Sequence, residues 1–289
     1  VLYETPHPAS AWLMGEISRV ENLVRDVKVK PVENGPVRAT VEVAHKYHNS
    51  EISEYISIYR GIPRLDFFTR IDWKEVSDEK IDGPMLKVAF TPLLGKTKAV
   101  FETPFGYIER PSDGTEVPAL RWVDISDEEY GVSLLNDSKH GFDVKGNTVR
   151  MTLLRTSYSP DPRPDYGKHE VLYSIYPHRG DWKEGKTFRR GYEVNHPLEC
   201  IVIRERPSAG SMPETRSFIQ VKPENVIRVY DATGQGANAE ISFGFKIEEA
   251  TEVDLMERKT NQLKVEGEGV TINLKPFEIK ALCVRPKRS

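Results

Sequence analysis

The chain has 289 residues, of which 38% are hydrophobic and 29% are charged, and its formal net charge is -3. At about 100 to 200 residues per domain, this length predicts one large domain or two moderate ones in an ordinary globular protein. The balance of 41 basic against 44 acidic residues argues against a nucleic-acid partner, because no basic surface is available to neutralise phosphates. No run approaches the roughly 18 apolar residues of a membrane span and no signal peptide is recognisable, so we expect no membrane partner.

Alternation of apolar and polar residues dominates the first two thirds of the chain. Such alternation predicts half-buried β-strands, separated by turns rich in Gly, Pro and Asn. No amphipathic helix of a dozen residues is predicted, and the nearest candidate, 18–29, reads equally well as strands. Strands without intervening helices pair antiparallel, so the fold class is all-β. The predicted strands include 37–43, 52–59, 65–73, 86–90 and 149–154, with turns at 33–36, 60–63 and 145–147.

A polar stretch with two prolines, 204–214, has no apolar periodicity and is typical of a linker. Short strands follow it, which predicts a second, smaller β domain. We therefore expect one domain at 1–206 and another at 215–289. The strands predicted in the second domain are 226–230, 239–245, 252–255, 270–274 and 279–284.

The chain contains two cysteines, Cys200 and Cys283, and each is flanked by apolar residues. Their number and separation exclude a disulfide framework, so both are predicted to be buried in strands. Scarcity of cysteine fits a reducing compartment, and we expect a cytoplasmic location. The first residue is Val1 rather than Met, as expected of a fragment or a processed product.

Three patterns suggest chemistry but lack the structural context that it needs. The glycine pattern at 234–239 matches a dinucleotide fingerprint, but a predicted strand follows it instead of a helix, so we interpret it as a turn. His45 and His48 stand three apart on a predicted strand and would point to opposite faces. His169 begins a zincin-like motif that has no second histidine. We therefore predict no metal site within this chain.

The segment 130–143 places an apolar strand before an unusually polar turn. A dense set of hydrogen-bonding side chains near an aromatic residue suits a sugar, whose hydroxyls pair with Asp, Asn and Lys. The alternative is a solvated turn of the Asx type with no ligand. Further downstream lie 153–155, 160–162 and the strand that ends at His178, followed by Trp182. The turn itself contains Asn136, Asp137, Ser138, Lys139, His140 and Gly141.

These segments resemble the C-terminal, non-barrel part of the retaining α-mannosidases, glycoside hydrolase family 38. The matching blocks occur in the same order along residues 1 to about 285. After Pro111 and after Asn225 the family usually has a longer segment than this chain. The blocks are 11–12, 35–39, 65–67, 72–73, 103–111, 121–124, 130–141, 153–155, 160–162, 176–178, 195–198, 228–234, 254–258 and 276–280.

The resemblance implies a large antiparallel β-supersandwich, similar to galactose mutarotase, followed by a small β-sandwich. In the family, an N-terminal barrel carries the nucleophilic aspartate, and the barrel and a helical domain bind zinc or another divalent metal. The resemblance therefore implies an intact enzyme that hydrolyses terminal α-mannosyl bonds with retention. This chain would be the non-catalytic portion of that enzyme, with no catalytic residue and no bound cofactor, and it would be inactive alone. Its partners would be the barrel, the helical domain and a mannoside or oligosaccharide substrate.

In the family the β part supplies side chains to the rim of the sugar pocket. The resemblance assigns that role here to Asn136, Asp137, Lys139, His140 and His178, with Asp137 and Lys139 bonding to sugar hydroxyls. The sequence does not decide the mannoside linkage, the metal or the oligomeric state.

Two alternatives stay open. The first is a stand-alone carbohydrate-binding or aldose-epimerase-like β protein, which needs a His and a Glu facing each other; His169, His178 and Glu170 are available for that role. The second is a structural domain whose outer strands form a homo-oligomer.

Overall fold

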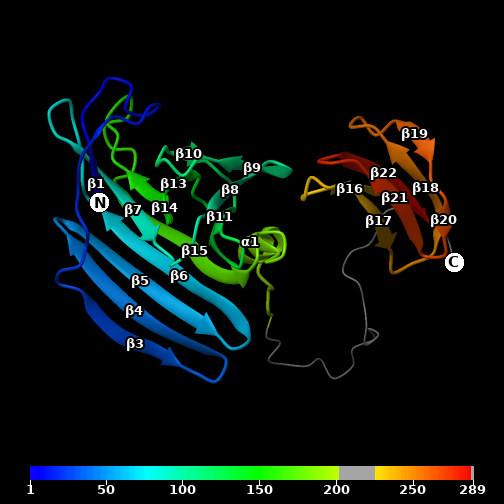
Figure 1. The fold of residues 1–289 in the computed structure, drawn as a ribbon, viewed down its shortest axis with the longest axis horizontal. Helices are drawn as coiled ribbons and strands as arrows, with labels where there is room; N and C mark the ends of the chain where they lie inside the picture. The colour runs from blue at the N-terminus through cyan, green and yellow to red at the C-terminus, as the bar shows by residue number, and fades with distance from the viewer. Residues whose placement is uncertain (202–224, 288–289) are drawn as a thin grey trace. The chain divides into compact units, whose positions relative to one another are not determined.

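A computed structural model describes residues 1–201 and 225–287, and its dominant element is the antiparallel β-strand (Figure 1). The prediction of an all-β fold is confirmed. The chain divides into two compact units. Unit 1 comprises Val1–Thr103 and Ile108–Pro197, and unit 2 comprises Pro104–Tyr107 with the described part of Leu198–Ser289.

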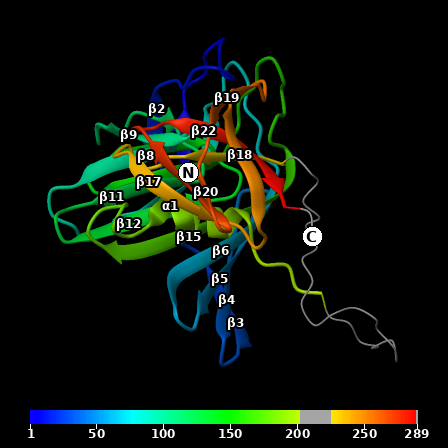
Figure 2. The same ribbon diagram turned by 90° about the vertical axis from the view of Figure 1, so that its right-hand side faces the viewer.

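Unit 1 contains a nine-stranded sheet in which β3, β4, β5 and β6 are successive neighbours (Figure 2). Every pairing registered in this sheet is antiparallel, as expected for strands joined by short turns. In sheet order the strands are β3 (Lys28–Asn34), β4 (Arg38–Tyr47), β5 (Ser50–Tyr59), β6 (Ile62–Trp73), β15 (Gly167–Arg179), β12 (Tyr130–Asn136), β11 (Trp122–Ser126), β8 (Lys98–Thr103) and β9 (Gly106–Arg110).

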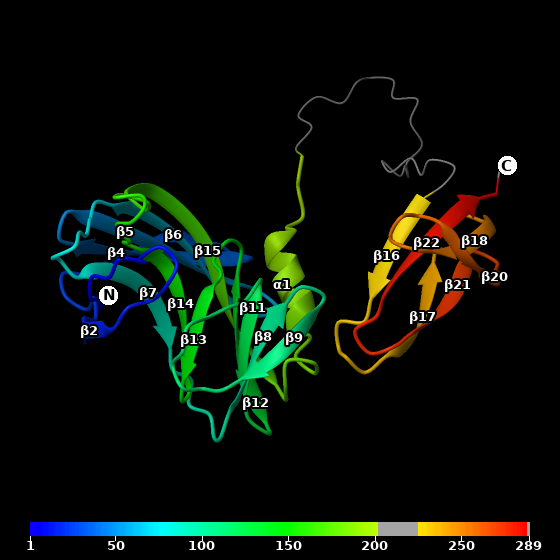
Figure 3. The same ribbon diagram turned by 90° about the horizontal axis from the view of Figure 1, so that it is seen from above.

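A second, six-stranded sheet of unit 1 faces one side of the nine-stranded sheet, so that unit 1 is a two-layer sandwich (Figure 3). In sheet order its strands are β10 (Val117–Pro118), β13 (Gly141–Lys145), β14 (Thr148–Arg155), β7 (Gly83–Phe90), β1 (Leu2–Glu4) and β2 (Ile17–Val20).

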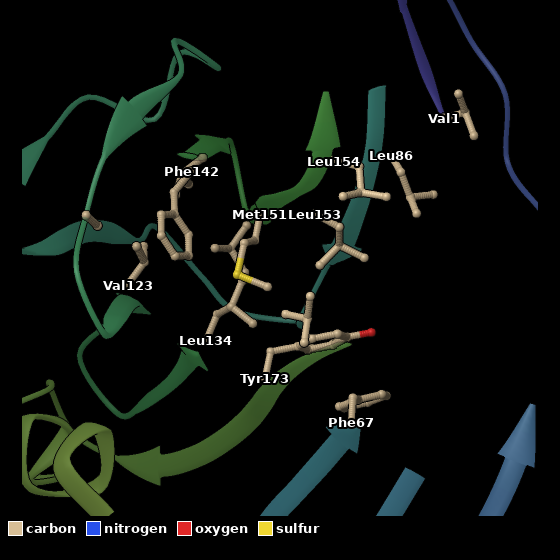
Figure 4. Packing of buried hydrophobic residues seen from close by; sticks show 14 of the residues in the cluster. Val1, Phe67, Leu86, Val123, Leu134, Phe142, Met151, Leu153, Leu154 and Tyr173 are labelled. Atoms are coloured by element: carbon tan, nitrogen blue, oxygen red, sulfur yellow. The ribbon is translucent and has the colours of Figure 1, made fainter. Parts of the chain in front are cut away.

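The core of unit 1 lies between the two sheets. Val123, Leu134 and Tyr173 of the larger sheet point toward Phe142 and Met151 of the smaller one (Figure 4). These five side chains are at most 1% exposed. Because side chains alternate along a strand, the neighbours of Val123, Leu134 and Tyr173 point to the opposite, outer face of the larger sheet.

The helix of unit 1, α1 (Thr187–Asn195), was not predicted. Lys186 at its N-terminus has a left-handed backbone and provides no side-chain cap, so the local signals of a helix start are missing. Gly191 also lowers helix propensity. The helix packs against β11 and β12, where a Cβ at Gly191 would lie 3.0 Å from the Trp122 ring. Tertiary packing therefore selects both the helix and its glycine.

Unit 2 consists of two smaller antiparallel sheets that share an apolar cluster including Ile247, Ile272 and Leu282. The four-stranded sheet has the order β16 (Asn225–Tyr230), β22 (Ile279–Pro286), β18 (Ile247–Val253) and β19 (Lys259–Gln262). The three-stranded sheet has the order β17 (Ala237–Ser242), β21 (Gly269–Leu274) and β20 (Val265–Glu266).

Several boundaries differ from the sequence predictions. Strand β17 ends at Ser242 and not at 245, and β18 begins at Ile247, five residues before the predicted start at 252. Cys283 lies half-buried in β22, but Cys200 is exposed outside any strand, so its prediction as a buried strand residue was wrong. The predicted linker 204–214 lies outside the described residues, and the domain limits 206 and 215 stay predictions.

Within the described residues, no helix has the length and apolar character required to span a membrane.

Replacing Leu134 by Ala should destabilise unit 1 by about 2–5 kcal/mol, because the lost methyl groups leave a cavity in a fully buried site. Urea unfolding followed by tryptophan fluorescence reports on this unit, since all four tryptophans lie in it. Leu93→Ala is the matched control, because Leu93 is fully exposed and its loss should change stability by less than about 0.5 kcal/mol. Equal urea midpoints for the two variants would contradict the assignment of the core.

Candidate functional site

The loop 136–141 joins β12 to β13, and Asn136 shapes its turn. The Asn136 side chain is buried, with 1% of the residue exposed. Its Nδ2 donates to the Leu120 carbonyl at 2.9 Å, and its Oδ1 accepts from the backbone N–H groups of Ser138 and Lys139 at 2.9 and 2.6 Å. This is an Asx turn. Asn136 therefore holds the loop, and its amide has no oxygen or nitrogen directed to solvent.

Asp137 fastens the loop to the edge of β15. Its backbone N–H donates to the Leu172 carbonyl at 3.1 Å, and its Oδ1 accepts from the Leu172 N–H at 3.3 Å. The same Oδ1 accepts from the Ser138 hydroxyl at 2.7 Å. The residue is exposed, and Oδ2 accepts no hydrogen bond from the described part of the chain. One carboxylate oxygen is thus held in place and available to a ligand donor.

Lys139 and His140 present the other polar groups of the loop. Burial lowers the pKa of Lys139, against the opposing attraction of Asp165 and Asp137. Its ammonium makes no hydrogen bond or ion pair with any residue that the structure describes. The Nδ1 of the exposed His140 lies 3.0 Å from the Ala119 carbonyl and must donate to it, which leaves Nε2 as an acceptor in the neutral ring.

The loop therefore brings together a carboxylate acceptor, an ammonium donor and an imidazole on one turn. Such a set is suited to hydroxyl groups, which both donate and accept hydrogen bonds. Because Asn136 and the pairing with Leu172 hold the turn, little conformational entropy would be lost on binding.

His178 lies elsewhere, in a buried network beneath the segment 181–197. Its side chain is 2% exposed, with Nε2 2.7 Å from Asp124 Oδ2 and Nδ1 3.2 Å from the Arg179 carbonyl. Both nitrogens face acceptors, which favours the doubly protonated ring. Burial works against that charge, but the hydrogen bond and negative charge of Asp124 outweigh it and raise the pKa of His178 above 6.5. The buried ring has no nitrogen to offer to a sugar.

The network around His178 connects the nine-stranded sheet to α1. Ser133 Oγ donates to Asp124 Oδ2 at 2.8 Å and lies 2.7 Å from Thr187 Oγ1, at the start of the helix. Gly131 and Gly185 form a slot for the imidazole, because a Cβ at either position would lie within 2.5 Å of its atoms. The sequence did not reveal this network, since its members are dispersed over β11, β12, β15 and α1.

Asn195, the last residue of α1, also supports the loop. Its Nδ2 donates to the Asn136 carbonyl at 2.9 Å and to the Gly191 carbonyl at 2.8 Å. The sequence placed Asn195 in a family-like block but offered no role for it.

The remaining histidines are not gathered into a site. His45 lies 3.3 Å from Glu54, whereas His48 lies in a turn after β4, 3.4 Å from Glu75. His169 bonds to the Asp165 carbonyl at 2.8 Å. Among the residues that the structure describes, no group of three or more His, Cys, Asp or Glu side chains could hold a metal.

The two glycines of the pattern, Gly234 and Gly236, lie in a turn, as predicted, and the remaining residues from Ala237 already belong to β17. The turn closes around Asp231, which accepts hydrogen bonds from the backbone N–H groups of Thr233, Gly236 and Phe277. Burial alone would raise the pKa of Asp231, but these bonds and the Thr233 hydroxyl outweigh it and lower the pKa to about 2. Both oxygens are used internally, which indicates a structural role.

Comparison with known families gives two matches, which follow one another along the chain and belong to the same family. Residues 1–163 match the model of the glycosyl hydrolases family 38 C-terminal domain. Residues 221–282 match the family 38 C-terminal beta sandwich domain. The chain belongs to glycosyl hydrolase family 38.

The family 38 chain is similar to curated proteins that are much longer. Alpha-mannosidase 2C1 of Mus musculus is 28% identical over 263 residues, which cover 81% of this chain and 24% of the relative. Alpha-mannosidase G of Dictyostelium discoideum is 29% identical over 284 residues, which cover 87% of this chain and 25% of the relative. The chain therefore spans about a quarter of the length of these curated relatives.

A solved structure supports the fold assignment. A family 38 glycosyl hydrolase from Enterococcus faecalis superposes with a TM-score of 0.71 and 15% identity, over 99% of this chain and 40% of that one. At this identity the similarity concerns the fold alone. It agrees with a large β-sandwich followed by a small one.

The His178 network should make the stability of unit 1 depend on pH. Because its pKa is raised on folding, His178 contributes stability that is fully present below its unfolded pKa of about 6.5 and is lost as the pH rises through the folded pKa. We expect the urea midpoint, followed by tryptophan fluorescence, to fall as the pH rises above about 6.5. In His178→Gln, which cannot titrate, this fall should be smaller. Parallel pH profiles for the two proteins would contradict the assignment.

Proposed function

We propose that this chain is the C-terminal, non-catalytic β region of a retaining α-mannosidase. The observation that carries the proposal is the pair of family matches, both to C-terminal domains, in a chain that covers 24% and 25% of two relatives named as alpha-mannosidases. In this proposal the chain supports a catalytic barrel and a helical domain, and it contributes part of the rim of the sugar pocket.

The chemistry of retention explains why the chain would depend on those other parts. A retaining glycosidase needs one carboxylate to form a glycosyl intermediate and a second group that acts first as acid and then as base. A divalent metal would hold hydroxyls of the sugar. The described residues do not fit a metal site, so we assign the metal, zinc or a similar ion, and the nucleophile to the catalytic barrel and helical domain.

At the rim, the exposed Asp137 and His140 and the half-buried Lys139 of the loop 136–141 would contact the sugar. Asp137 Oδ2 would accept from a hydroxyl, Lys139 would donate to one, and His140 Nε2 would accept. We propose a positioning role for Asn136, through its turn, and for His178, through the network that holds 181–197. This revises the initial assignment of Asn136 and His178 as rim residues.

The substrate proposed for the intact enzyme is a terminal α-mannoside, free or at the end of an oligosaccharide. We also propose a cytoplasmic location, for which the low cysteine content is the support.

Hydrolysis of p-nitrophenyl α-mannoside tests the proposal directly. The 289-residue chain should show no turnover, whereas a protein that also contains the upstream region should be active when Zn²⁺ or Co²⁺ is added. Turnover by the 289 residues alone would contradict the assignment of catalysis to another part of the enzyme. An upstream region that encodes no barrel would favour the stand-alone sugar-binding alternative.

In the longer enzyme, Asp137→Asn and Lys139→Ala should each lower kcat/KM. A hydrogen bond to a charged group contributes about 1.5–3 kcal/mol, so the loss should be about tenfold to a hundredfold. Asn at position 137 keeps an Oδ1 acceptor for Ser138 and Leu172, so the loop should keep its shape.

Lys168→Ala is the matched control for these two variants, because Lys168 is an exposed lysine of β15 outside the loop. Its kcat/KM should stay within about twofold of the unmodified enzyme, since exposed side chains away from a site contribute little. Equal effects of Lys139→Ala and Lys168→Ala would show that the loop does not contact the substrate.

A further inference from the structure

The outer face of the nine-stranded sheet carries a groove that no role described above uses. The segment 181–197 covers this face over β11 and β12 and leaves it open over β4, β5 and β6. The groove has a volume of about 450 Å³, within the usual range for ligand sites. One wall is formed by Glu193, Val194 and Pro197, and the opposite wall by Val32 and Glu33 of β3.

The strand register builds an aromatic floor in this groove. Tyr55 of β5 is paired with Phe68 of β6, and their ring centroids lie 6.4 Å apart. Tyr59 lies four residues after Tyr55, on the same face of β5. The guanidinium of Arg70, which is paired with Glu170, lies 5.6 Å from the Tyr55 centroid and 5.2 Å from the Phe68 centroid, so a ligand would stack on the ring area that Arg70 does not cover. Half-buried aromatic rings offer apolar surface at low entropic cost, which suits the C–H face of a pyranose.

Hydrogen-bonding groups stand beside the aromatic floor. Arg64 donates to Asp66 through two bonds of 2.6 and 3.0 Å, and the hydroxyls of Thr40 and Ser57 lie 2.9 Å apart. The Asp66 carboxylate also accepts from Ser174 at 2.7 Å. These groups are held in fixed positions by one another, and hydroxyl and guanidinium groups retain further capacity for hydrogen bonds.

The charges in the groove are balanced. Arg64 is paired with Asp66, Arg38 with Glu33 at 2.7 Å, and Glu193 with Arg190 at 2.7 Å. A site for a phosphate or a nucleic acid needs surplus positive charge, which this groove lacks. Aromatic rings, paired charges and hydroxyls together favour a neutral polyhydroxyl ligand.

Two contacts connect the lining of the groove to the loop 136–141. Leu172, which lines the groove, is bonded through both its backbone groups to Asp137. Asn195, two residues after Glu193, donates to the Asn136 carbonyl. From β3 to β15 the face spans four strand spacings of about 4.8 Å, or about 19 Å in all, which is long enough for several sugar rings.

We propose that this groove is an oligosaccharide subsite that binds the sugar residues next to the terminal mannosyl residue at the loop 136–141. The inference rests on the proposed function. If the groove is such a subsite, an extended mannoside occupies the whole site, whereas a small aryl mannoside occupies only the part at the loop.

Titration of the 289-residue chain with linear α-linked mannotetraose and with methyl α-mannoside tests this inference without any need for catalysis. The tetrasaccharide should bind at least tenfold more tightly than the monosaccharide. Tyr55→Ala and Tyr59→Ala should each reduce the tetrasaccharide affinity at least fivefold, whereas Tyr55→Phe should retain most of it. Tyr130→Ala is the control, because Tyr130 is an exposed tyrosine of the same sheet outside the groove.

No binding of mannotetraose, equal affinity for the two ligands, or equal effects of Tyr55→Ala and Tyr130→Ala would overturn the proposal. An unchanged urea midpoint, followed by tryptophan fluorescence, establishes that a variant is folded. If Tyr55→Ala is not folded, Tyr59→Ala takes its place in the comparison with Tyr130→Ala.

The longer enzyme separates this inference from the proposed function. If Tyr55→Ala lowers kcat/KM for mannotetraose but not for p-nitrophenyl α-mannoside, the subsite is supported. Equal losses with both substrates, together with a lower melting temperature, would make the face a contact with the catalytic region and overturn the subsite. Tetrasaccharide binding without mannoside hydrolysis by the longer protein would instead refute the proposed function and leave the groove as a sugar site.

Discussion

Strand β15 is the constraint on which most of unit 1 depends. It pairs with β6 along one edge and with β12 along the other, so its alternation sets what lies on each side of the nine-stranded sheet. Val171 and Tyr173 point into the core between the sheets, whereas Leu172 and His178 point to the outer face. A shift of one residue in its register would exchange these two sets.

The outer side of β15 connects three features that the sequence presents separately. His178 anchors the segment 181–197, Leu172 lines the groove, and the backbone of Leu172 fixes the loop through Asp137. Polar groups on this side are therefore divided by burial. Under the helix, His178 and Ser133 bond to Asp124 and contribute to order, although Asp124 Oδ1 and Trp122 Nε1 are buried without a hydrogen-bond partner among the described residues. On the loop, Asp137 keeps an exposed, unpaired oxygen that can meet a ligand.

Membership of family 38 gives this arrangement its context. The chain spans about a quarter of its curated relatives, and its described residues form a fold with no metal-binding cluster. In the function proposed above, this β region influences how a sugar approaches and how far its chain extends. Positioned side chains on a fixed scaffold are how such a region would influence a reaction carried out elsewhere.

The sequence by itself determined the all-β class, the strands around 52–59 and 65–73, and turns such as those at Gly61 and Gly146, where the backbone has positive φ. These features depend on local alternation and on glycine's conformational freedom, which a single stretch of sequence contains. It also identified the polar loop, because Asn136 and its neighbours form a local Asx turn.

Only the tertiary structure decided the rest. Helix α1 has weak local signals and depends on the Trp122 ring against Gly191. The burial of His178 depends on Asp124, which is 54 residues away, and the aromatic floor depends on strand register. Each of these arises from contacts between residues distant in the chain, and no local pattern records such contacts.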